Sequence, residues 1–570
     1  MDPAGSFADL ATASLKTERL GPLPLLNHFL GRIGLAEILE RFVPTRDRRC
    51  ALPYASGLLV LLRSILVHRE PIYRQHEMVS EFAPEAFGLT PDQAQRLHDD
   101  QIGRALDRLF DADRGTLLTE IILAVHARFD LGFDELHNDS TSIRFAGQYE
   151  HASGRFLRGQ RAPCITYGHS KDHRPDLKQL LFIVTTTTDG GVPTQFRYAD
   201  GNTNDCTTHL ATWESLRVIA GRPDFLYVAD SKLCSGEVME AIDRRGGRFV
   251  TVLPRSRKED SLFRRWAQQH EPTWELARDR PNPRRQGGPR NRWWVFRSPL
   301  CSQEGWPIIW VFSALLRIRQ QRRRVERIAA ATFELQLLAR QLSGPRPYTY
   351  SHARVTERVE HLLRRFRVKR YLHVRLRKQE RHQFRQAGPG RPGPRTAFHR
   401  KTRCVWIPEC ATDDAAVAYD HHTDGMYPLL TNDRKLAPKE VLAAHKRQPA
   451  LEKRFEQLKT VFEIAPVLLK NEGRVEALFF LYFLAFLVQA LIERQLRRAM
   501  QQQGLDDLPL YPEERRQRHP TCEQISRLFS SVQRSVLHTP DHPLKAFPPE
   551  LTARQVQVLQ LLGVPETAYR

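Results

Sequence analysis

The sequence DFLYVADS, from Asp224 to Ser231, carries five consecutive apolar residues followed by an aspartate and a serine. A short apolar run that ends in this way is typical of a buried β-strand. Three more β-rich runs lie near it and are bounded by Gly, Pro, Asp or Asn: LFIVTTTT (181–188), TQFRYADG (194–201) and GRFVTVLP (247–254). Two stretches with helical character lie between them: HLATWESLRVIAG (209–221) and SGEVMEAIDRRG (235–246). This alternation predicts an α/β fold with a mixed sheet flanked by helices.

The sequence that precedes this region has a helical pattern. In LPLLNHFLGRIGLAEILERFVP (23–44) apolar residues recur at the three- and four-residue spacing of a helix face until Pro44. SGLLVLLRSILVHR (56–69) and LHDDQIGRALDRLFDAD (97–113) have the same character, and the second opens on aspartates that suit a helix N-cap. A small helical domain is therefore predicted, although this pattern does not establish a helix-turn-helix.

The net charge of +22 is concentrated in one part of the chain. Residues 255–403 contain 37 Lys and Arg against 11 Asp and Glu, a net charge of +26, whereas the remaining residues sum to −4. A local cluster such as Arg322, Arg323 and Arg324 can be an ordinary solvated helix face, but a block of this length indicates a polyanionic partner. Nucleic acid is the first choice and an anionic membrane surface the second.

The basic block has mixed secondary-structure signals. RWWVFRSP (292–299) and WPIIWVFSA (306–314) resemble strands, a long helix is expected from about Leu315 to Leu342, and GPGRPGPR (388–395) is expected to be a flexible loop. After it, strand character returns in VAYDHHTDGMYPLLTN (417–432). A helix follows over about 438–463, which Pro449 should kink or restart.

The rest of the chain reads as helical and contains its most apolar stretch, Ala477 to Val488. This stretch is too short for a membrane span, which needs roughly 20 residues, so a buried helix is expected. The N-terminal 20 residues have no apolar core of a signal peptide, and the eight cysteines show no C-x-x-C pair. These features favour reduced thiols, a cytoplasmic location and no membrane association.

Two aspartates stand where catalytic carboxylates could lie. Asp230 follows the strand Phe225 to Ala229, and the carboxyl ends of strands are where open α/β sheets bind ligands; the alternative is a helix N-cap. Asp139 lies in the β-rich stretch DELHNDSTSIRFAG (134–147), where a buried carboxylate needs a partner such as a metal ion. Its alternative is an Asx-turn residue.

The helix AAHKRQPALEKRFEQLKTVF (443–462) offers a third carboxylate. At 100° per residue, His445, Gln448, Glu452 and Lys459 share an arc of about 60° beside an apolar stripe. Glu452 therefore borders the core, where a metal ligand can be held rigidly, and Lys459 could hold a phosphate. The alternative is an exposed Glu and Lys at the edge of an amphipathic helix.

Several blocks together resemble bacterial insertion-sequence transposases of the DDE type, in the branch with a ribonuclease-H-like domain and a long insertion before the last acid. They are NDST around Asp139, GHSKDHRPDLKQ (168–179), GNTND (201–205), VADS around Asp230, and the E-x6-K spacing of Glu452 and Lys459. The family's glutamate helix commonly reads Y-x2-R-x3-E-x6-K. This chain has His445 and Gln448 in place of the Tyr and Arg, and Arg447 or Lys446 could substitute in gripping a phosphate.

The resemblance implies a catalytic triad of Asp139, Asp230 and Glu452 that holds two Mg²⁺ ions, with Mn²⁺ as a substitute. It also implies double-stranded DNA as partner, both terminal inverted repeats and target, and a homodimer that joins two ends. Water would free a 3′-hydroxyl at the element end, and that hydroxyl would attack target DNA. Further residues expected near the site or on DNA are Lys171, Lys178, His169, Asp172, Lys446, Arg447, Gln448, Lys459 and Arg322 to Arg324.

The expected organisation has five parts: a helical N-terminal DNA-binding domain (1–128), the first part of the catalytic domain (129–254), a basic α+β insertion (255–403), the second part of the catalytic domain (404–470) and a helical C-terminal region (471–570). Two alternatives stay open at this point. A hydrolytic nuclease on the same fold would use the same metals without joining strands, and a non-enzymatic DNA-binding protein would lack the chemistry.

Overall fold

The computed structural model of the chain describes residues 14–47, 50–281, 288–344, 351–461, 464, 469–511, 513–538 and 543–570. The chain divides into two compact units. The first unit comprises Met1–Thr251 and Ala443–Arg570, and the second comprises Val252–Leu442. The second unit thus contains the whole predicted insertion together with residues 404–442.

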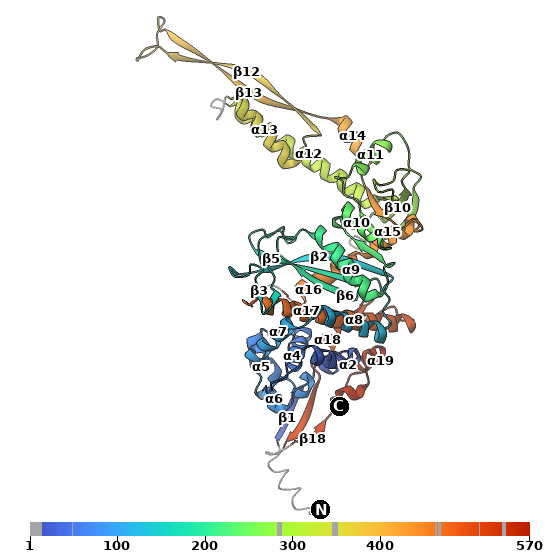
Figure 1. Cartoon of the computed structure of the whole chain (residues 1–570). Coiled ribbons are helices and arrows are strands. Elements are labelled where there is room, and N and C mark those ends of the chain that lie inside the picture. The colour runs from blue at the N-terminus through green and yellow to red at the C-terminus, as the bar shows by residue number, and fades with distance from the viewer. Residues whose placement is uncertain are drawn as a thin grey trace, which may run out of the picture. The chain divides into compact units, whose positions relative to one another are not determined.

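A mixed sheet forms the centre of the first unit (Figure 1). Its strands are β2 (Glu135–Phe145), β5 (Lys178–Thr187), β6 (Pro193–Ala199), β7 (Leu226–Ala229) and β8 (Arg248–Val252), in the order β6-β5-β2-β7-β8. β2 pairs antiparallel with β5 and parallel with β7, which in turn pairs parallel with β8. The predicted α/β class with a ribonuclease-H-like mixed sheet is confirmed, and every strand predicted between residues 181 and 254 is present.

The helices predicted between these strands are also present, as α9 (His209–Ala220) and α10 (Gly236–Arg244). The predicted apolar helix is α17 (Glu472–Gln502), and its most apolar 18 residues are wholly buried within the protein. Phe479 packs on Phe145 and Phe182 of the sheet, with ring centroids 6.2 and 5.7 Å away. Figure 1 shows α17 between the sheet and the N-terminal helices. The expectation of a buried helix is confirmed, because protein covers α17 on both sides.

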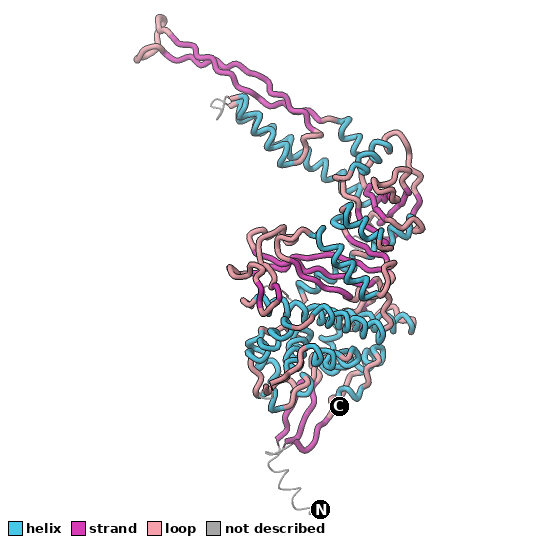
Figure 2. The backbone as a smooth tube through the Cα atoms, viewed as in Figure 1, coloured by secondary structure: helices cyan, strands magenta, loops and turns pink. Residues whose placement is uncertain are grey.

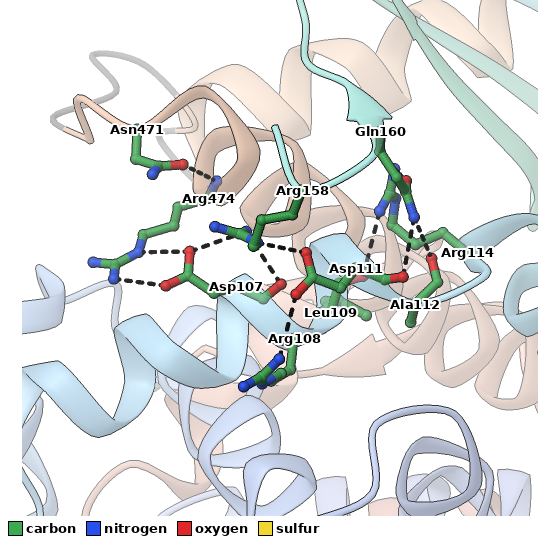
Figure 3. A network of polar contacts seen from close by, with 10 residues as sticks. All are labelled: Asp107, Arg108, Leu109, Asp111, Ala112, Arg114, Arg158, Gln160, Asn471 and Arg474. Carbon is green, nitrogen blue, oxygen red and sulfur yellow. Dashed lines mark hydrogen bonds and ion pairs between the residues drawn. The ribbon is translucent and has the colours of Figure 1, made fainter. Parts of the chain in front are cut away.

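The predicted N-terminal helices are confirmed as well. They are α2 (Leu23–Ile33), α3 (Leu35–Phe42), α4 (Tyr54–Val67), α5 (Gln75–Ser80), α6 (Pro91–Gln95), α7 (Asp99–Asp111) and α8 (Arg114–Phe129). A polar network joins α7 to the rest of the unit (Figure 3). Arg474 of α17 binds Asp107 at 2.8 Å, and Arg158, between the short strands β3 (Phe156–Leu157) and β4 (Gln160–Arg161), binds Asp111 at 2.6 Å.

The C-terminal region is less helical than predicted. Beside α18 (Cys522–Phe529) and α19 (Ala553–Leu562) it contains β15 (Leu508–Pro509), β16 (Arg516–Gln517), β17 (Gln533–His538) and β18 (Pro543–Phe547). β17 lies between β18 and β1 (Ser14–Arg19), antiparallel to both. The pairing of β17 with β1 could not be predicted from a local stretch of sequence, because the two strands lie about 500 residues apart.

In the second unit four strands pair antiparallel, in the order β14-β11-β10-β9. Its strands are β9 (Glu275–Arg280), β10 (Asn291–Arg297), β11 (Ile308–Ser313) and β14 (Met426–Thr431), and α11 (Lys258–Trp266) stacks Phe263 on Trp310 of β11. Strand character was predicted from Val417, but residues Asp414–His422 form a helix, α14. Asp413 caps it by accepting a hydrogen bond from the Ala416 amide, which starts the helix where apolar content alone suggested a strand.

The most extended part of the second unit is a hairpin of two 15-residue strands, β12 (Leu372–Gln386) and β13 (Phe398–Thr412). The base of the hairpin packs on α13 (His352–Phe366) and on the predicted long helix, α12 (Ala314–Ser343), which is confirmed. The other half extends beyond these helices (Figure 2). The predicted loop at Gly388–Arg395 is its tip, but the hairpin itself was not predicted, since its strands are too rich in arginine to show an apolar alternation.

Candidate active site

Asp139 lies in the middle of β2, and its carboxylate is only partly exposed to solvent. Its Oδ1 accepts a hydrogen bond of 2.7 Å from the Ser140 amide, and its side chain is 22% exposed. Burial raises the pKa of Asp139 to about 6, because desolvation disfavours the charged form; Lys171 opposes this, and the negative charges of Asp230 and Asp205 add to it. The charges of Lys171, Asp205 and Asp230 thus all act on the Asp139 carboxylate.

Asp230 reaches this neighbourhood because β7 runs parallel to β2. Asn138 pairs with Ala229 in the register of the two strands, so the residues that follow, Asp139 and Asp230, stand at corresponding positions. The Asp230 side chain also accepts a 3.0 Å hydrogen bond from the Lys232 amide, which caps the short helix Ser231–Leu233. The two interpretations of Asp230 from the sequence are therefore compatible: it caps a helix, and it stands beside Asp139 in the register of the two strands.

A third carboxylate, Asp205, was not among the predicted site residues. Ser140 Oγ donates a 2.9 Å hydrogen bond to Asp205 Oδ2. The Lys171 ammonium lies 3.1 Å from the same oxygen and 3.6 Å from Asp139 Oδ1, and it donates to Ser140 O and Oγ at 2.7 and 2.6 Å. Asp205 ends the GNTND block that carried the family resemblance, and that block was the signal that could have identified it.

Buried hydrogen bonds between polar side chains hold β2 next to Asp139. Thr185 Oγ1 donates to Asn138 Oδ1 at 2.9 Å, and His209 Nδ1 lies 3.0 Å from the Tyr227 hydroxyl. Burial lowers the pKa of His209 to about 4, so this imidazole is neutral at physiological pH although Asp230 and Asp205 oppose the shift. A neutral, hydrogen-bonded histidine here supports the strands rather than adding charge to the site.

Glu452 lies on α16 (Pro449–Thr460), which is separated from α15 (Pro438–Arg447) at Gln448 as the proline predicted. Gln448 Nε2 lies 3.5 Å from Asn138 O, and Lys459 Nζ binds Asp172 at 2.7 Å. Glu452 stands on the same helix face between these two contacts, because it follows Gln448 by four residues and precedes Lys459 by seven. Its side chain is exposed, with no hydrogen bond or ion pair to any residue the structure describes.

The structure therefore brings Asp139 and Asp230 together but leaves Glu452 outside their group. Among the described residues, no three His, Cys, Asp or Glu side chains are placed to hold a metal ion together. The oxygens around Lys171 nevertheless fit a cation, because the tethered ammonium already lies between Asp139, Asp205 and Ser140. Carboxylate and hydroxyl oxygens are also the ligands that Mg²⁺ prefers.

The position of α16 is fixed by a buried ion pair to α17. Arg454 binds Glu493 at 2.6 Å, with side chains 6% and 1% exposed, and also donates to Gly190 O at 2.7 Å. Glu493 further accepts hydrogen bonds from Gln457 and from the Cys522 amide. The helix that carries Glu452 is thus anchored two residues after it.

The other predicted site residues of the first unit have diverse contacts. Arg447 binds Glu135 at 2.7 Å, and the Lys178 ammonium donates to the backbone oxygens of Gln148 and Tyr149. Lys446 is half-buried, and His169 contributes its backbone oxygen to the Gln179 side chain at 3.2 Å. Lys171, Gln448 and Arg447 contact β2, the strand of Asp139. Lys459 contacts Asp172 in the segment that holds Lys171.

Two glycines of the blocks 168–179 and 201–205 let their backbones approach closely. A Cβ on Gly168 would lie 1.8 Å from Gly201 O, and a Cβ on Gly201 would lie 2.1 Å from Gln179 O. Gln179 Nε2 donates to Gly201 O at 2.9 Å across this contact. The glycines therefore position the segments that carry Lys171 and Asp205.

Replacing Gly201 by Ala should destabilise the protein by at least about 2–3 kcal/mol, because backbone atoms rather than a flexible side chain must move. Thermal unfolding measured by circular dichroism would test this. Gly31→Ala is the matched control, since a Cβ at that position in α2 meets nothing within 4 Å, and it should be neutral or slightly stabilising. Equal melting temperatures for Gly201→Ala and the wild type would contradict the close approach.

The three predicted arginines of α12 lie in the second unit and differ from one another. Arg322 binds Glu326 at 2.7 Å on the exposed face, Arg323 is exposed, and Arg324 forms an ion pair with Asp424 in which the side chains are 10% and 6% exposed. The cluster is thus not one uniform basic surface.

Comparison with known families gives two matches. Residues 134–488 match the family described as "Transposase DDE domain", and residues 15–123 match a domain of unknown function, DUF4277. No curated protein matches the chain. The first match covers more than half of the chain, including the strands and helices that carry Asp139, Asp230 and Glu452, and the protein therefore belongs to the family of DDE-domain transposases.

Proposed function

We propose that this transposase cleaves DNA at the ends of its own insertion sequence and joins the freed 3′ ends to target DNA in a reaction that needs divalent metal ions. One observation carries the proposal: Asp139 and Asp230 follow paired residues on two neighbouring parallel strands, and their charges interact. Such a pair on two neighbouring strands inside the sheet is costly for the metal-free fold and useful for holding cations.

Asp139, Asp230 and Glu452 are the residues proposed to hold two Mg²⁺ ions, or Mn²⁺ in their place. Such ions would supply activation of the attacking oxygen and stabilisation of the leaving oxygen at the phosphodiester. Glu452 must approach the two aspartates for this, and its position on the Gln448–Lys459 face of α16 supports that approach. Lys171 must move away from Asp139, because its positively charged ammonium group would repel an incoming metal ion.

The chain's own residues would orient the DNA. Lys459, which is paired with Asp172, and Lys171, which is paired with Asp205, can turn toward phosphate oxygens when the strand arrives. Asn138 and His209 hold the strand of Asp139 in register and remain uncharged. The helical N-terminal domain is proposed to recognise the inverted repeats, and a homodimer is proposed to bring two ends together.

The decisive experiment is a strand-transfer assay with the purified chain, Mg²⁺, a duplex that carries the element's ends, and supercoiled target DNA. The proposal expects cleavage at the element end followed by covalent joining to the target. Cleavage without joining would identify a nuclease, and DNA binding without cleavage would identify a binding protein. Short inverted repeats bounded by a direct target duplication beside the gene would supply the correct end sequence.

The hairpin β12–β13 is proposed to bind DNA through its charge. Residues 372–412 contain ten Lys and Arg against two acidic residues, and the half beyond the helices carries exposed Phe384 and Phe398, 65% and 50% exposed. A two-stranded ribbon of this kind fits a DNA groove, and arginines along it contact phosphates.

Replacing Arg385, Arg391, Arg395 and Arg400 by Gln should weaken duplex binding by more than tenfold at 0.1 M salt. The slope of log K against log salt should fall by up to about 3.6, since each phosphate contact contributes about 0.9. Fluorescence anisotropy across a salt series measures both. The matched control replaces the same four arginines by Lys, which keeps the charge and should keep the slope; an unchanged slope in the Gln variant would remove the hairpin from the DNA interface.

A further inference from the structure

The second unit contains a cavity of about 610 Å³ with a strongly basic lining. Residues of α11, α12 and α14 and of the segments next to them form its walls. Seven arginines and three aspartates line it. No residue of the candidate active site belongs to this lining.

The three aspartates are already neutralised by arginines of the same cavity. Each forms one ion pair: Asp260 with Arg264 at 2.8 Å, Asp424 with Arg324 at 2.5 Å, and Asp420 with Arg370 at 3.2 Å. Arg264 also donates to the backbone oxygens of Thr423 and Met426, which ties α11 to the opposite wall. These pairs make rigid walls and leave no acidic side chain for the remaining arginines.

Four arginines of the lining, Arg255, Arg265, Arg323 and Arg327, have no carboxylate within ion-pair distance in the described part of the chain. All four are exposed to solvent. Since guanidinium groups stay charged, the cavity holds four unneutralised positive charges. Like charges gathered in one concave surface repel one another, and low-dielectric walls focus their potential toward an anion.

The helical repeat of α12 explains which arginines reach this cavity. Consecutive residues lie 100° apart, so the run Arg322-Arg323-Arg324 is spread around the helix. Arg322 points away and binds Glu326, whereas Arg324 enters the buried pair with Asp424. Arg323 shares its face with Arg327, four residues on, and both line the cavity.

We propose that this cavity is a binding site for linked phosphate groups. Arginine forks match phosphate oxygens in pairs, and a volume within the range of roughly 300–1,000 Å³ for ligand sites exceeds what a single phosphate needs. The phosphates belong either to successive nucleotides of a DNA strand or to a free polyphosphate chain. In the first case the site rests on the proposed function, because it would hold DNA during cleavage and joining.

The test compares two double variants of the full chain on the same helix. Arg323→Gln with Arg327→Gln removes two charges from the cavity, and Arg319→Gln with Arg322→Gln removes two exposed charges that do not line it. Calorimetry with tripolyphosphate and anisotropy with a 20-base-pair duplex are measured for both. The cavity variant should lose at least tenfold in tripolyphosphate affinity, and the control variant less than twofold, with equal melting temperatures.

The duplex measurement identifies the source of the phosphates. If the cavity variant also binds duplex at least tenfold more weakly, with a salt slope smaller by about 1.8, the site holds a DNA strand. If duplex binding is unchanged while tripolyphosphate binding is lost, the site holds a free polyphosphate. Equal losses in the cavity and control variants, or no tripolyphosphate binding by the wild type, would overturn the proposal. An absence of Mg²⁺-dependent cleavage by the wild type would instead refute the proposed function and leave the cavity result intact.

Discussion

Asp230→Asn is expected to reduce DNA cleavage by at least about a thousandfold while salt-dependent DNA binding changes by less than about twofold. A loss of about 4 kcal/mol in transition-state stabilisation corresponds to this factor, and a metal ligand contributes several kcal/mol. Asn suits the substitution because it can still cap the helix Ser231–Leu233, as Asp230 does through the Lys232 amide. The variant therefore removes the negative charge and keeps the local fold.

The matched control is Asp224→Asn at the other end of the same strand, where the side chain is 59% exposed and lies 3.6 Å from Arg222. That variant should cleave at the wild-type rate. Cleavage is measured on a labelled duplex with the element's end, and binding by anisotropy on the same duplex without metal. If Asp230→Asn cleaves like the control, Asp230 is not part of the catalytic group, and the proposed triad is wrong.

Glu493→Gln is expected to destabilise the first unit by about 3–5 kcal/mol, the cost of leaving a buried charge without its partner. Arg454 would lose a 2.6 Å ion pair at a position where it is 6% exposed, and Arg497 would lose a second contact to the same carboxylate at 3.2 Å. The melting temperature should fall by on the order of 10 °C. Because Arg454 lies two residues after Glu452 on α16, cleavage should fall more than DNA binding.

The control for this prediction is Glu523→Gln on α18. The Glu523 side chain is 42% exposed and binds Arg527 within one helical turn, so the change should alter stability by less than about 0.5 kcal/mol. Combining Glu493→Gln with Arg454→Met tests the mechanism further. Arg454→Met removes the charge that Glu493→Gln leaves without a partner, so it should recover part of the lost stability. Replacing both members of a buried ion pair costs less stability than removing only one of them. A double variant less stable than the wild type by the sum of both single effects would show that the two residues act independently.

Much of the fold could be predicted from the sequence because local patterns report local burial. The apolar run before Asp230, the β-rich runs from Leu181 to Pro254 and the apolar stretch Ala477–Val488 of α17 each reflect a single element covered by protein. The break before α16 followed from the geometry of Pro449, and it is present at Gln448. Asp139 and Asp230 could be predicted as candidate site residues, because Asp139 is a carboxylate within a β-rich stretch and Asp230 directly follows a buried strand.

The tertiary structure alone decided which of these residues meet. The parallel pairing of β2 with β7 brings Asp139 beside Asp230, and a loop brings Lys171 between Asp139 and Asp205, which no window around Asp139 contains. The hairpin β12–β13 was missed because its arginine-rich strands show little apolar alternation. The pairing of β17 with β1 was missed because the two strands lie far apart in the sequence. Periodicity records whether one element has a covered face, whereas ion pairs and strand partners depend on how distant parts of the chain close on each other. The sequence therefore determined the class of this protein and its candidate carboxylates, and only the folded chain determined their neighbours.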